Sequence, residues 1–487
     1  MSNKTLAFIF GFIFFAKLLM AQTSDSYTLQ KCIEIALANN ITMKQSLLTV
    51  EGNKVAVNQA KMNRYPNLNA GASQSLNFGR SVNPYDNTVV ANQKVNSSSL
   101  SLSSNVNLFS GFQNERTIQQ RRLNLKASQE DIATTRNNIV LGVVEAFANV
   151  LSNKALLAST TAQFQSTEAQ IDRTDKLVKA GRLALTNLYD LKAQLAIEET
   201  NIVLTENNLE ISKLSLAQWM QIDPILITDV IEPSLFIEEQ AEKSAKEVYV
   251  VAESNQPQIS AAKTRLVSAD KDIEIAKSGF YPSLSFQAGL FTNYSSLARN
   301  FIPGKTLNAP ILAPVNTLLL QDATGNLVPF TVNQVITSGP GTFENLKFND
   351  QFDNNLRAGF TFNLNIPLFN AFQNRYLTEN ARISKLNAKL QLDQQKNQLR
   401  QTIESAVTNE KAAKKRIEAV DKQLLALEEA FRSTEQRYNL GVLNTVDFLL
   451  SKNNLARAQN DKSRFRYDFF IRRAVLDFYL GKDLNFN

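Results

Sequence analysis

Histidine is absent from all 487 residues of the chain, and cysteine occurs once, at Cys32. Without histidine the chain lacks the commonest general base and the commonest metal ligand, and it can form no Ser-His or Cys-His catalytic pair. A single thiol can form no internal disulfide, so Cys32 is expected to be a small apolar residue beside Leu29 and Ile33 on a helix face. No catalytic residue, metal site or cofactor is predicted, and the chain is not expected to be an enzyme.

Long apolar runs are missing after the first residues. Lys4, the apolar stretch Leu6–Ala16 and the small residue Ala21 before Gln22 predict a secretory signal peptide over residues 1–21. Cys32 lies too far beyond this cleavage point to carry a lipid anchor. No later segment approaches 18 consecutive apolar residues, so any insertion into a membrane must use strands. The net charge of +7 is spread along the chain with both signs mixed, which does not predict a nucleic-acid partner.

Proline and glycine are missing from long stretches. Residues 372–440 contain neither, and no proline occurs between Pro84 and Pro224. These stretches predict helices over residues 113–180 and 373–440, each on the order of 100 Å long. Gly181 and Gly441 would end them in a left-handed conformation. Asn187 and Asp447 would then cap returning helices over residues 187–220 and 447–480. The second long helix also carries an apolar seam with coiled-coil spacing, formed by Ala413, Ile417, Val420, Leu424, Leu427 and Phe431.

Four segments alternate apolar and polar residues, which predicts strands with one apolar and one polar face. They cover residues 66–80, 97–109, 282–294 and 352–369. A half-buried sheet of a soluble protein would show the same alternation. Here the polar positions are mostly Ser, Asn, Thr and Gly with few charges, and this composition favours strands of a membrane barrel with a wet interior.

The order of these segments occurs twice. Ala60-Lys61 and Tyr65-Pro66 in the first copy correspond to Ala276-Lys277 and Tyr281-Pro282 in the second. Likewise, Leu108-Phe109 corresponds to Leu368-Phe369, and Gly181 corresponds to Gly441. An internal duplication is therefore predicted. The first repeat covers residues 22–250 and starts with a helix over 27–64, and the second covers 251–487 and starts with a helix over 251–280. Loops over 81–96 and 295–351 would face outside the cell, the second being an irregular surface loop with a hairpin near 327–336.

Four strands are too few to close a barrel, since about eight strands form the smallest barrel that side chains can fill. A sheet in a bilayer must close because its backbone polar groups cannot be left open in hydrocarbon. The chain is therefore expected to donate its strands to an assembly. Tyr65, Tyr281, Phe109 and Phe369 lie where strand meets helix. They fit interfacial aromatics of a membrane protein, and they equally fit core packing at a junction.

The duplicated strand-strand-helix-helix plan resembles the TolC family of outer-membrane efflux proteins. The resemblance rests on the Ala-Lys-x-x-x-Tyr-Pro junctions, the Leu-Phe-x-[Gly/Ala]-Phe helix starts and the glycine turn before Asp447. It implies an α+β membrane protein in which three copies share a 12-stranded β-barrel above a helical coiled-coil tunnel in the periplasm. It further implies a passive exit channel for efflux or type I secretion, opened by a periplasmic adaptor and an inner-membrane pump, with outer-membrane lipid around the barrel.

The resemblance also suggests where the tunnel closes. Tyr438 matches a tyrosine that helps to hold the tunnel shut, and Asp447 matches an acidic residue at its narrow end. Leu443, Leu450 and Asn187 stand where the family carries an arginine and two acidic residues. The candidate gate or tip residues are therefore Tyr438, Asp447, Gly441, Gly181 and Asn187, with Tyr438 and Asp447 equally open to the plainer roles of packing aromatic and helix cap.

Two other classes of protein remain as alternatives. A periplasmic adaptor also carries a long helical hairpin, but it has one such hairpin inserted in soluble β-domains, without the paired strands found here. A structural coiled-coil protein would leave the alternating strands unexplained.

Overall fold

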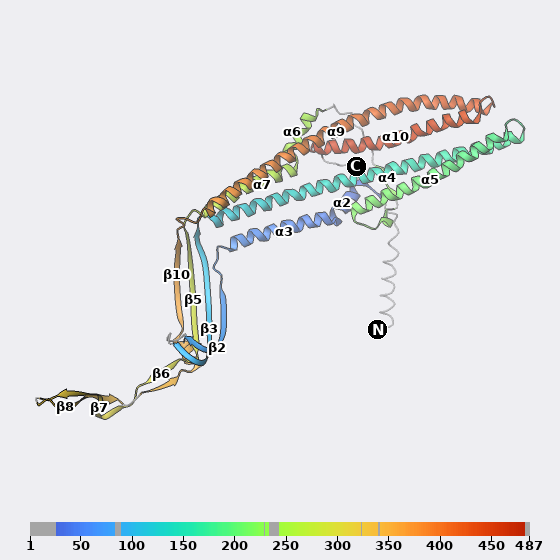
Figure 1. Ribbon diagram of the computed structural model, residues 1–487. Helices are drawn as coiled ribbons and strands as arrows, with labels where there is room; N and C mark the ends of the chain where they lie inside the picture. The colour runs from blue at the N-terminus through green and yellow to red at the C-terminus, as the bar shows by residue number, and fades with distance from the viewer. Residues whose placement is uncertain are drawn as a thin grey trace, which may run out of the picture. The chain divides into compact units, whose positions relative to one another are not determined.

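The computed structural model describes residues 26–82, 89–227, 229–232, 243–322, 324–338 and 341–482 (Figure 1). The chain divides into two compact units. A helical unit consists of Met1–Gln59, Arg116–Ile273 and Leu377–Asn487, and a strand unit consists of Ala60–Glu115 and Glu274–Tyr376. Each unit therefore contains segments of both predicted repeats. The predicted signal peptide, residues 1–21, lies outside the described residues.

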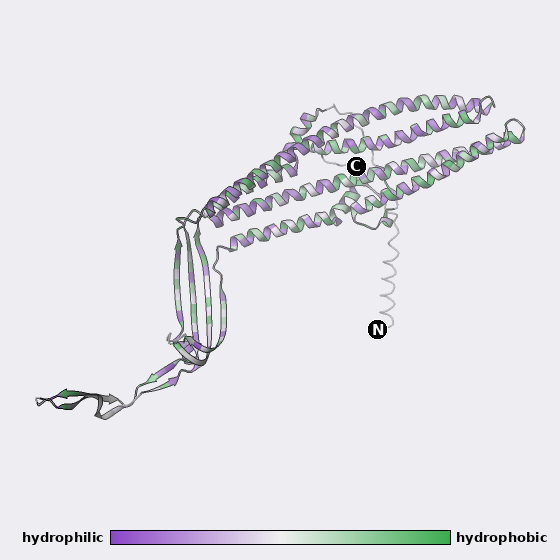
Figure 2. Cartoon of the chain, in the orientation of Figure 1, coloured by the Kyte–Doolittle hydropathy of each residue, from purple (hydrophilic) through white to green (hydrophobic). Residues whose placement is uncertain are grey.

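Two long helical hairpins dominate the helical unit (Figure 1). The first consists of α4 (Gln113–Lys179) and α5 (Leu185–Met220), and the second of α9 (Gln373–Asn439) and α10 (Thr445–Tyr479). Both α4 and α9 have 67 residues without a break, as the sequence predicts. Ala413, Val420 and Leu424 of the predicted seam are buried. Hydrophilic and hydrophobic residues alternate along all four helices, which is typical of helices with one covered stripe (Figure 2).

The helix that starts each repeat is broken in two, so the single helices predicted over 27–64 and 251–280 are wrong. The first copy contains α2 (Leu29–Asn39) and α3 (Ile41–Met62), and the second contains α6 (Ala245–Asn255) and α7 (Pro257–Ser278). Asn40 leaves the helical conformation, and its side chain accepts hydrogen bonds from the backbone N–H groups of Thr42 and Met43. Pro257 has no N–H to continue α6 and instead opens α7.

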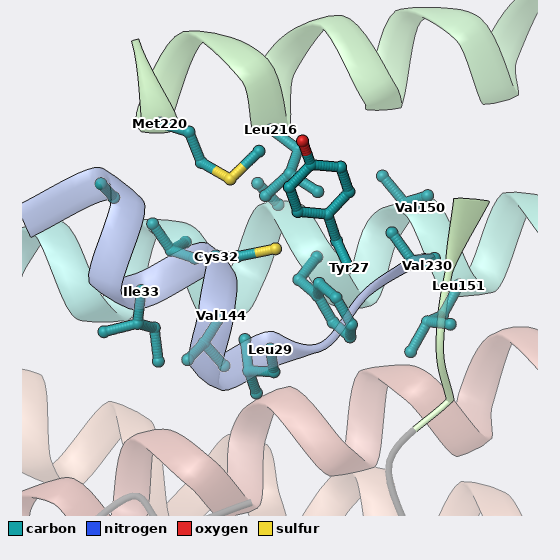
Figure 3. Close-up of a cluster of buried hydrophobic side chains, with 14 of the residues drawn as sticks. Tyr27, Leu29, Cys32, Ile33, Val144, Val150, Leu151, Leu216, Met220 and Val230 are labelled. Atoms are coloured by element: carbon teal, nitrogen blue, oxygen red, sulfur yellow. The ribbon is translucent and has the colours of Figure 1, made fainter. Parts of the chain in front are cut away.

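Two of the apolar clusters in the helical unit lie where the shorter helices α2 and α6 pack against the hairpins. The larger one packs α2 against α4, α5 and α10, around Leu29, Cys32 and Phe147 (Figure 3). It also contains Tyr27 and Val230 from the short parallel pair of β1 (Ser26–Tyr27) and β4 (Asp229–Val230). Strand β4 follows the short helix η1 (Pro224–Leu226). The smaller cluster joins α6, α7, α9 and α10, around Val248 and Ile403. The predicted apolar role of Cys32 is confirmed.

One stretch of α4 is long and apolar enough to cross a membrane by length and composition. Val143, Phe147 and Val150 of α4 are buried in the larger cluster, which also contains residues of α2 and α5. Part of α4 therefore belongs to the core of the helical unit.

The strand unit contains a four-stranded antiparallel sheet in the order β10-β5-β3-β2. Its strands are β2 (Asn69–Val82), β3 (Val89–Ser110), β5 (Ser283–Ser295) and β10 (Arg357–Asn365). The pairing of β3 with β5 joins the two copies. The strand predicted over 352–369 is shorter in the structure. Its first residues belong to a helix, and Pro367 lacks the N–H that would extend the ladder.

The segment predicted as an irregular loop over 295–351 has regular structure in its described part. Strand β6 (Arg299–Ile302) pairs with β9 (Thr342–Asn345), and β7 (Thr306–Gln321) pairs with β8 (Leu327–Ser338). The expected hairpin near residues 327–336 is thus one arm of a longer hairpin. Helix α8 (Phe348–Asn354) follows, and the buried Gln351 side chain ties it to both backbone groups of Ser295. Within the predicted loop 81–96, residues 83–88 lie outside the described residues, and β2 and β3 cover all of the rest.

The buried thiol gives a test of the core. Burial raises the pKa of Cys32 to about 12, so the reactive thiolate is roughly a thousandfold scarcer at pH 8 than for a solvent-exposed cysteine. We expect a maleimide to label the folded protein at a negligible rate and the denatured protein fully, as measured by mass spectrometry. Since Cys32 is the only cysteine, rapid labelling of the folded protein would contradict this packing of α2.

Candidate functional site: an exposed apolar sheet and two helical tips

The four-stranded sheet separates its residue types by face, as the alternation predicts. In the paired register Leu102 lies opposite Leu290, and Phe362 lies opposite Phe286. Their rings and alkyl groups share one face with Ala70, Ala72, Leu100, Leu284, Ala358, Phe360 and Leu364. The opposite face carries Ser73 and Ser99, whose hydroxyls are 2.8 Å apart, within a field of other small polar residues.

The apolar face is uncovered in the single chain. Phe360 is 73% exposed and Phe362 is 67% exposed, although both rings contact Phe286 across the sheet. Among the described strands, β2 and β10 each pair on one side only. A broad apolar face with two open edges is unstable in water, and it fits hydrocarbon only if the open edges are paired. The sheet is therefore suited to a lipid environment and to partner strands.

The strand-to-helix junctions have the same conformation in both copies. Gly111 and Phe112 have φ of 60° and 66°, and Ala371 and Phe372 have φ of 51° and 62°. Two consecutive left-handed residues form an abrupt turn, which is costly for residues other than glycine. Phe109 and Phe112 meet edge-to-face at 5.2 Å, and the equivalent pair of the second copy meets at 5.5 Å. Tyr65, Tyr281 and Phe369 are exposed, so core packing within the chain does not explain these aromatics.

The glycine turns at the two helical tips are equivalent in detail. Gly181 and Gly441 have φ of 73° and 76°, in the left-handed region predicted for them. Arg182 N–H donates to the Leu177 carbonyl, and Val442 N–H donates to the Arg437 carbonyl. Each glycine N–H donates to the carbonyl three residues earlier, so both turns satisfy the helix end in the same way. The predicted helix ends are confirmed to within a residue.

The predicted caps of the returning helices are wrong. Helix α5 follows Ala184 and has no side-chain cap, and Asn187 lies within its first turn. Helix α10 is capped by Asn444, whose side chain accepts from Asp447 N–H at 2.8 Å. The Asn444 amide in turn donates to the Asp447 carboxylate at 2.9 Å. The turns are tighter than expected, so each returning helix starts earlier than predicted. Asp447 therefore lies in the first turn of α10, near the positive end of the helix dipole.

Tyr438 is fully enclosed at the second tip. Its ring stacks on Phe448 of the same hairpin with 4.4 Å between ring centroids, and its hydroxyl lies 3.2 Å from the Thr445 hydroxyl. Leu191 of α5 completes the cluster, and Leu443 packs against it. The cluster therefore connects the α9–α10 tip with the first hairpin. Sequence reasoning singled out Tyr438 but missed Phe448 and Leu191, whose spacing within the apolar seams is their only signal.

The other gate candidates do not share this packing. Asp447, Gly441 and Gly181 are exposed, and Asn187 is half-buried. The tip of the second hairpin also exposes the apolar side chains of Leu440, Val442, Val446 and Leu450. The structure thus brings Tyr438 into an inner cluster and leaves the remaining candidates at the surface of the single chain.

A buried polar network next to this cluster was also missed. Lys452 of α10 lies 3.9 Å from Glu198 of α5, and both contact the Thr167 hydroxyl of α4. Each of these residues occupies a seam position where apolar residues are expected, which is the signal that sequence analysis could have used. The described residues contain no group of three His, Cys, Asp or Glu side chains that could hold a metal ion.

Comparison with known proteins agrees with the fold. The family model for "Outer membrane efflux protein" matches residues 32–220 and 248–482. Outer membrane protein TolC of Escherichia coli is 22% identical over 466 residues, covering 94% of this chain and 83% of the relative. The crystal structure of VceC from Vibrio cholerae superimposes with a TM-score of 0.72 at 17% identity, covering 94% of this chain and 97% of VceC. The CmeC outer membrane channel of Campylobacter jejuni gives a TM-score of 0.72 at 14% identity, covering 93% and 85%.

These matches define a class of outer-membrane channels that combine strands with a helical tunnel, and this class is not one of enzymes. The chain belongs to the outer membrane efflux protein family. Its location is accordingly the outer membrane, with an extension into the periplasm, and the resemblance predicted from the sequence is confirmed.

The Tyr438 cluster can be tested by hydrogen exchange. Replacing a buried aromatic residue by alanine costs about 3–5 kcal/mol, whereas loss of one hydrogen bond costs about 1 kcal/mol. We expect Tyr438→Ala to accelerate amide exchange over residues 431–450 and Tyr438→Phe to change it little. Exchange around Val248 and Ile403, in the separate cluster of α6 and α9, serves as the internal control. Equal exchange in all three proteins would show that the ring does not hold the tip.

Proposed function

We propose that the protein is a passive trimeric exit channel of the outer membrane, serving a tripartite efflux or type I secretion system. The observation that carries the proposal is the exposed apolar face of the β10-β5-β3-β2 sheet, together with its open edges at β2 and β10. When copies pair edge to edge, the open edges of such a sheet gain hydrogen-bond partners, and its apolar face can lie against lipid. Three copies of four strands would form a closed barrel of about 12 strands with the Ser- and Asn-rich face inward.

The helical unit supports a tunnel in the same assembly. Ile197 and Val203 of α5 and Leu390 and Leu425 of α9 are exposed apolar residues, so one helix of each hairpin presents them. Neighbouring copies would cover these residues, as the facing helix does in a coiled coil. The two sequence repeats, 22–250 and 251–487, would then contribute equivalent hairpins around the tunnel wall. Outer-membrane lipid would be the only other partner of the barrel, and no nucleic acid is involved.

The helical tips are the proposed gate. Tyr438 would hold the second hairpin inward through its cluster with Leu191, and Asp447 and Asn187 would line the narrow end. Helix ends would separate about the turns at Gly181 and Gly441 when a partner binds. The partner would be a periplasmic adaptor joined to an inner-membrane pump, and exposed Val442 and Val446 offer apolar contacts for the helical tip of such an adaptor.

Single-channel recording tests the proposed gate. We expect purified protein in planar bilayers to show discrete conductance with a low open fraction. Tyr438→Ala should raise the open fraction about tenfold or more, because it removes packing worth more than 1.4 kcal/mol, and Asp447→Ala should reduce cation selectivity. Tyr249→Ala, in the cluster of α6 and α9, is the matched control. Absence of discrete conductance from the wild type and both tip variants would overturn the proposed function.

The orientation of the sheet is tested separately. A tryptophan at Phe360 would lie on the apolar face, and a tryptophan at the adjacent Thr361 would lie on the polar face. We expect brominated lipids to quench the emission of Phe360→Trp strongly and that of Thr361→Trp weakly, with native Trp219 contributing the same background to both. Equal quenching, or protein that stays in the soluble periplasmic fraction, would favour an adaptor instead.

A further inference from the structure

Three helices from both copies meet at one buried ion pair. Lys452 of α10 is 6% exposed, Glu198 of α5 is 4% exposed, and Thr167 of α4 is fully buried. The Lys452 ammonium lies 3.9 Å from Glu198 Oε1. Lys452 follows Phe448 of the tip cluster by one helical turn on the buried side of α10. The pair therefore stands directly behind the proposed gate.

The polar atoms of this network satisfy one another. The Thr167 hydroxyl accepts a hydrogen bond from Lys452 Nζ and donates to Glu198 Oε2 at 2.5 Å. Lys452 Nζ also donates to the Gln163 carbonyl at 3.3 Å, and Gln194 Nε2 donates to Glu198 Oε1 at 2.9 Å. The ammonium has three N–H donors, and its oxygen neighbours are the Thr167 hydroxyl, the Gln163 carbonyl and Glu198 Oε1. The network thus fixes α10 against both helices of the first hairpin.

Stability alone does not account for such a pair. Burial lowers the pKa of Lys452, while the carboxylates of Glu198 and of Glu435 on α9 act in the opposite direction. Apolar residues of similar volume often replace a buried ion pair without loss, whereas removal of one partner is strongly destabilising. With an ion pair at this seam position, the contact between α10 and the first hairpin is stable only while both charged partners are in place. A leucine at the same position would hold the helices together without such a requirement.

The same helix offers a contrasting pair. Lys462 of α10 lies 2.8 Å from Asp421 of α9, but its side chain is 48% exposed and that of Asp421 is 44% exposed. Such a pair contributes little because water screens it. The two lysines therefore share a helix and a type of partner and differ in burial.

We propose that Lys452 is a positioning residue of the channel, which with Glu198 clasps the second hairpin to the first and keeps the Tyr438–Phe448 tip closed. The inference rests on the proposed function, because it assigns a closed state to these tips. When α10 moves away from α4 and α5, the clasp must break and leave both charges to water. The clasp sets how readily the tips part.

Two readouts on the full-length protein test the clasp. Spin labels at Tyr189 and Val446, both exposed, report the separation of α5 and α10 in a Cys32→Ala background, with labelled protein diluted by unlabelled copies. Bilayer recording reports the open fraction. We expect Lys452→Met to lengthen the label distance and to raise the open fraction about tenfold or more, because Glu198 is left buried and unpaired. Lys452→Arg should stay close to the wild type, and Lys462→Met, the matched control, should change neither readout.

The double variant separates a clasp from a simple packing defect. Lys452→Met combined with Glu198→Leu buries no charge, so we expect the tips to close again and the open fraction to fall to the wild-type value or below. This variant also keeps the proposal testable if Lys452→Met fails to assemble. The proposal is overturned if Lys452→Met matches Lys462→Met, or if the double variant is as open as the single one. A wild type without conductance would refute the proposed function, while the label distances would still decide the clasp.

Discussion

The arrangement of the chain depends on one constraint, which is that backbone N–H and C=O groups at a sheet edge must find partners wherever water is scarce. In the single chain, the backbone groups between neighbouring strands of the order β10-β5-β3-β2 are paired. Among the described strands, the outer edges of β10 and β2 have no partner. The sheet also leaves phenylalanine rings on an open face. A soluble protein would cover such a face with helices, but in the strand unit the described helix α8 contacts only the end of β5.

The two copies of the repeat are held together by different interactions in the two units. In the sheet, β3 of the first copy pairs directly with β5 of the second, so backbone hydrogen bonds join the copies. In the helical unit, side chains join them, through the larger apolar cluster, the Tyr438 cluster and the Lys452 network. Each copy retains the same abrupt junction at Phe112 and Phe372 and the same glycine turn. The two copies thus share the backbone geometry at the ends of their long helices. Their side chains differ along the length of those helices.

Much of the fold could be predicted from the sequence because its signals are local and long. Sixty-seven residues without proline leave little alternative to a continuous helix, and period-two alternation directly gives the faces of the sheet. Predictions failed where a single side chain redirects the backbone. Asn40 interrupts a segment that otherwise reads as a continuous helix, and Asn444 caps α10 three residues before the expected position. Strand β7 was missed, and the hairpin expected near 327–336 was placed within the single strand β8, because the prolines of this segment suggested irregular structure, although proline is tolerated in edge strands.

The candidate site was less predictable. Glycines with positive φ could be recognised from the sequence because few residues adopt that conformation. Leu191, which packs with Tyr438, and Glu198, which pairs with Lys452, both belong to α5, more than 240 residues away along the chain, and no local pattern connects them. The family resemblance pointed to Tyr438. It did not point to the Lys452 network, because the motifs that carry the resemblance do not include the residues of that network.

The buried seam of α4 changes character along its length. Around Val143–Leu151 it is apolar, whereas the positions closer to the tip are Thr160, Thr167, Gln170 and Thr174. Burial of apolar surface weakens on cooling, but hydrogen bonds and ion pairs do not share that dependence. The two parts of this seam therefore differ in their response to temperature. Cooling weakens the apolar contacts near Val143–Leu151 more than the polar contacts nearer the tip, so one continuous helix carries two contacts with different temperature dependence.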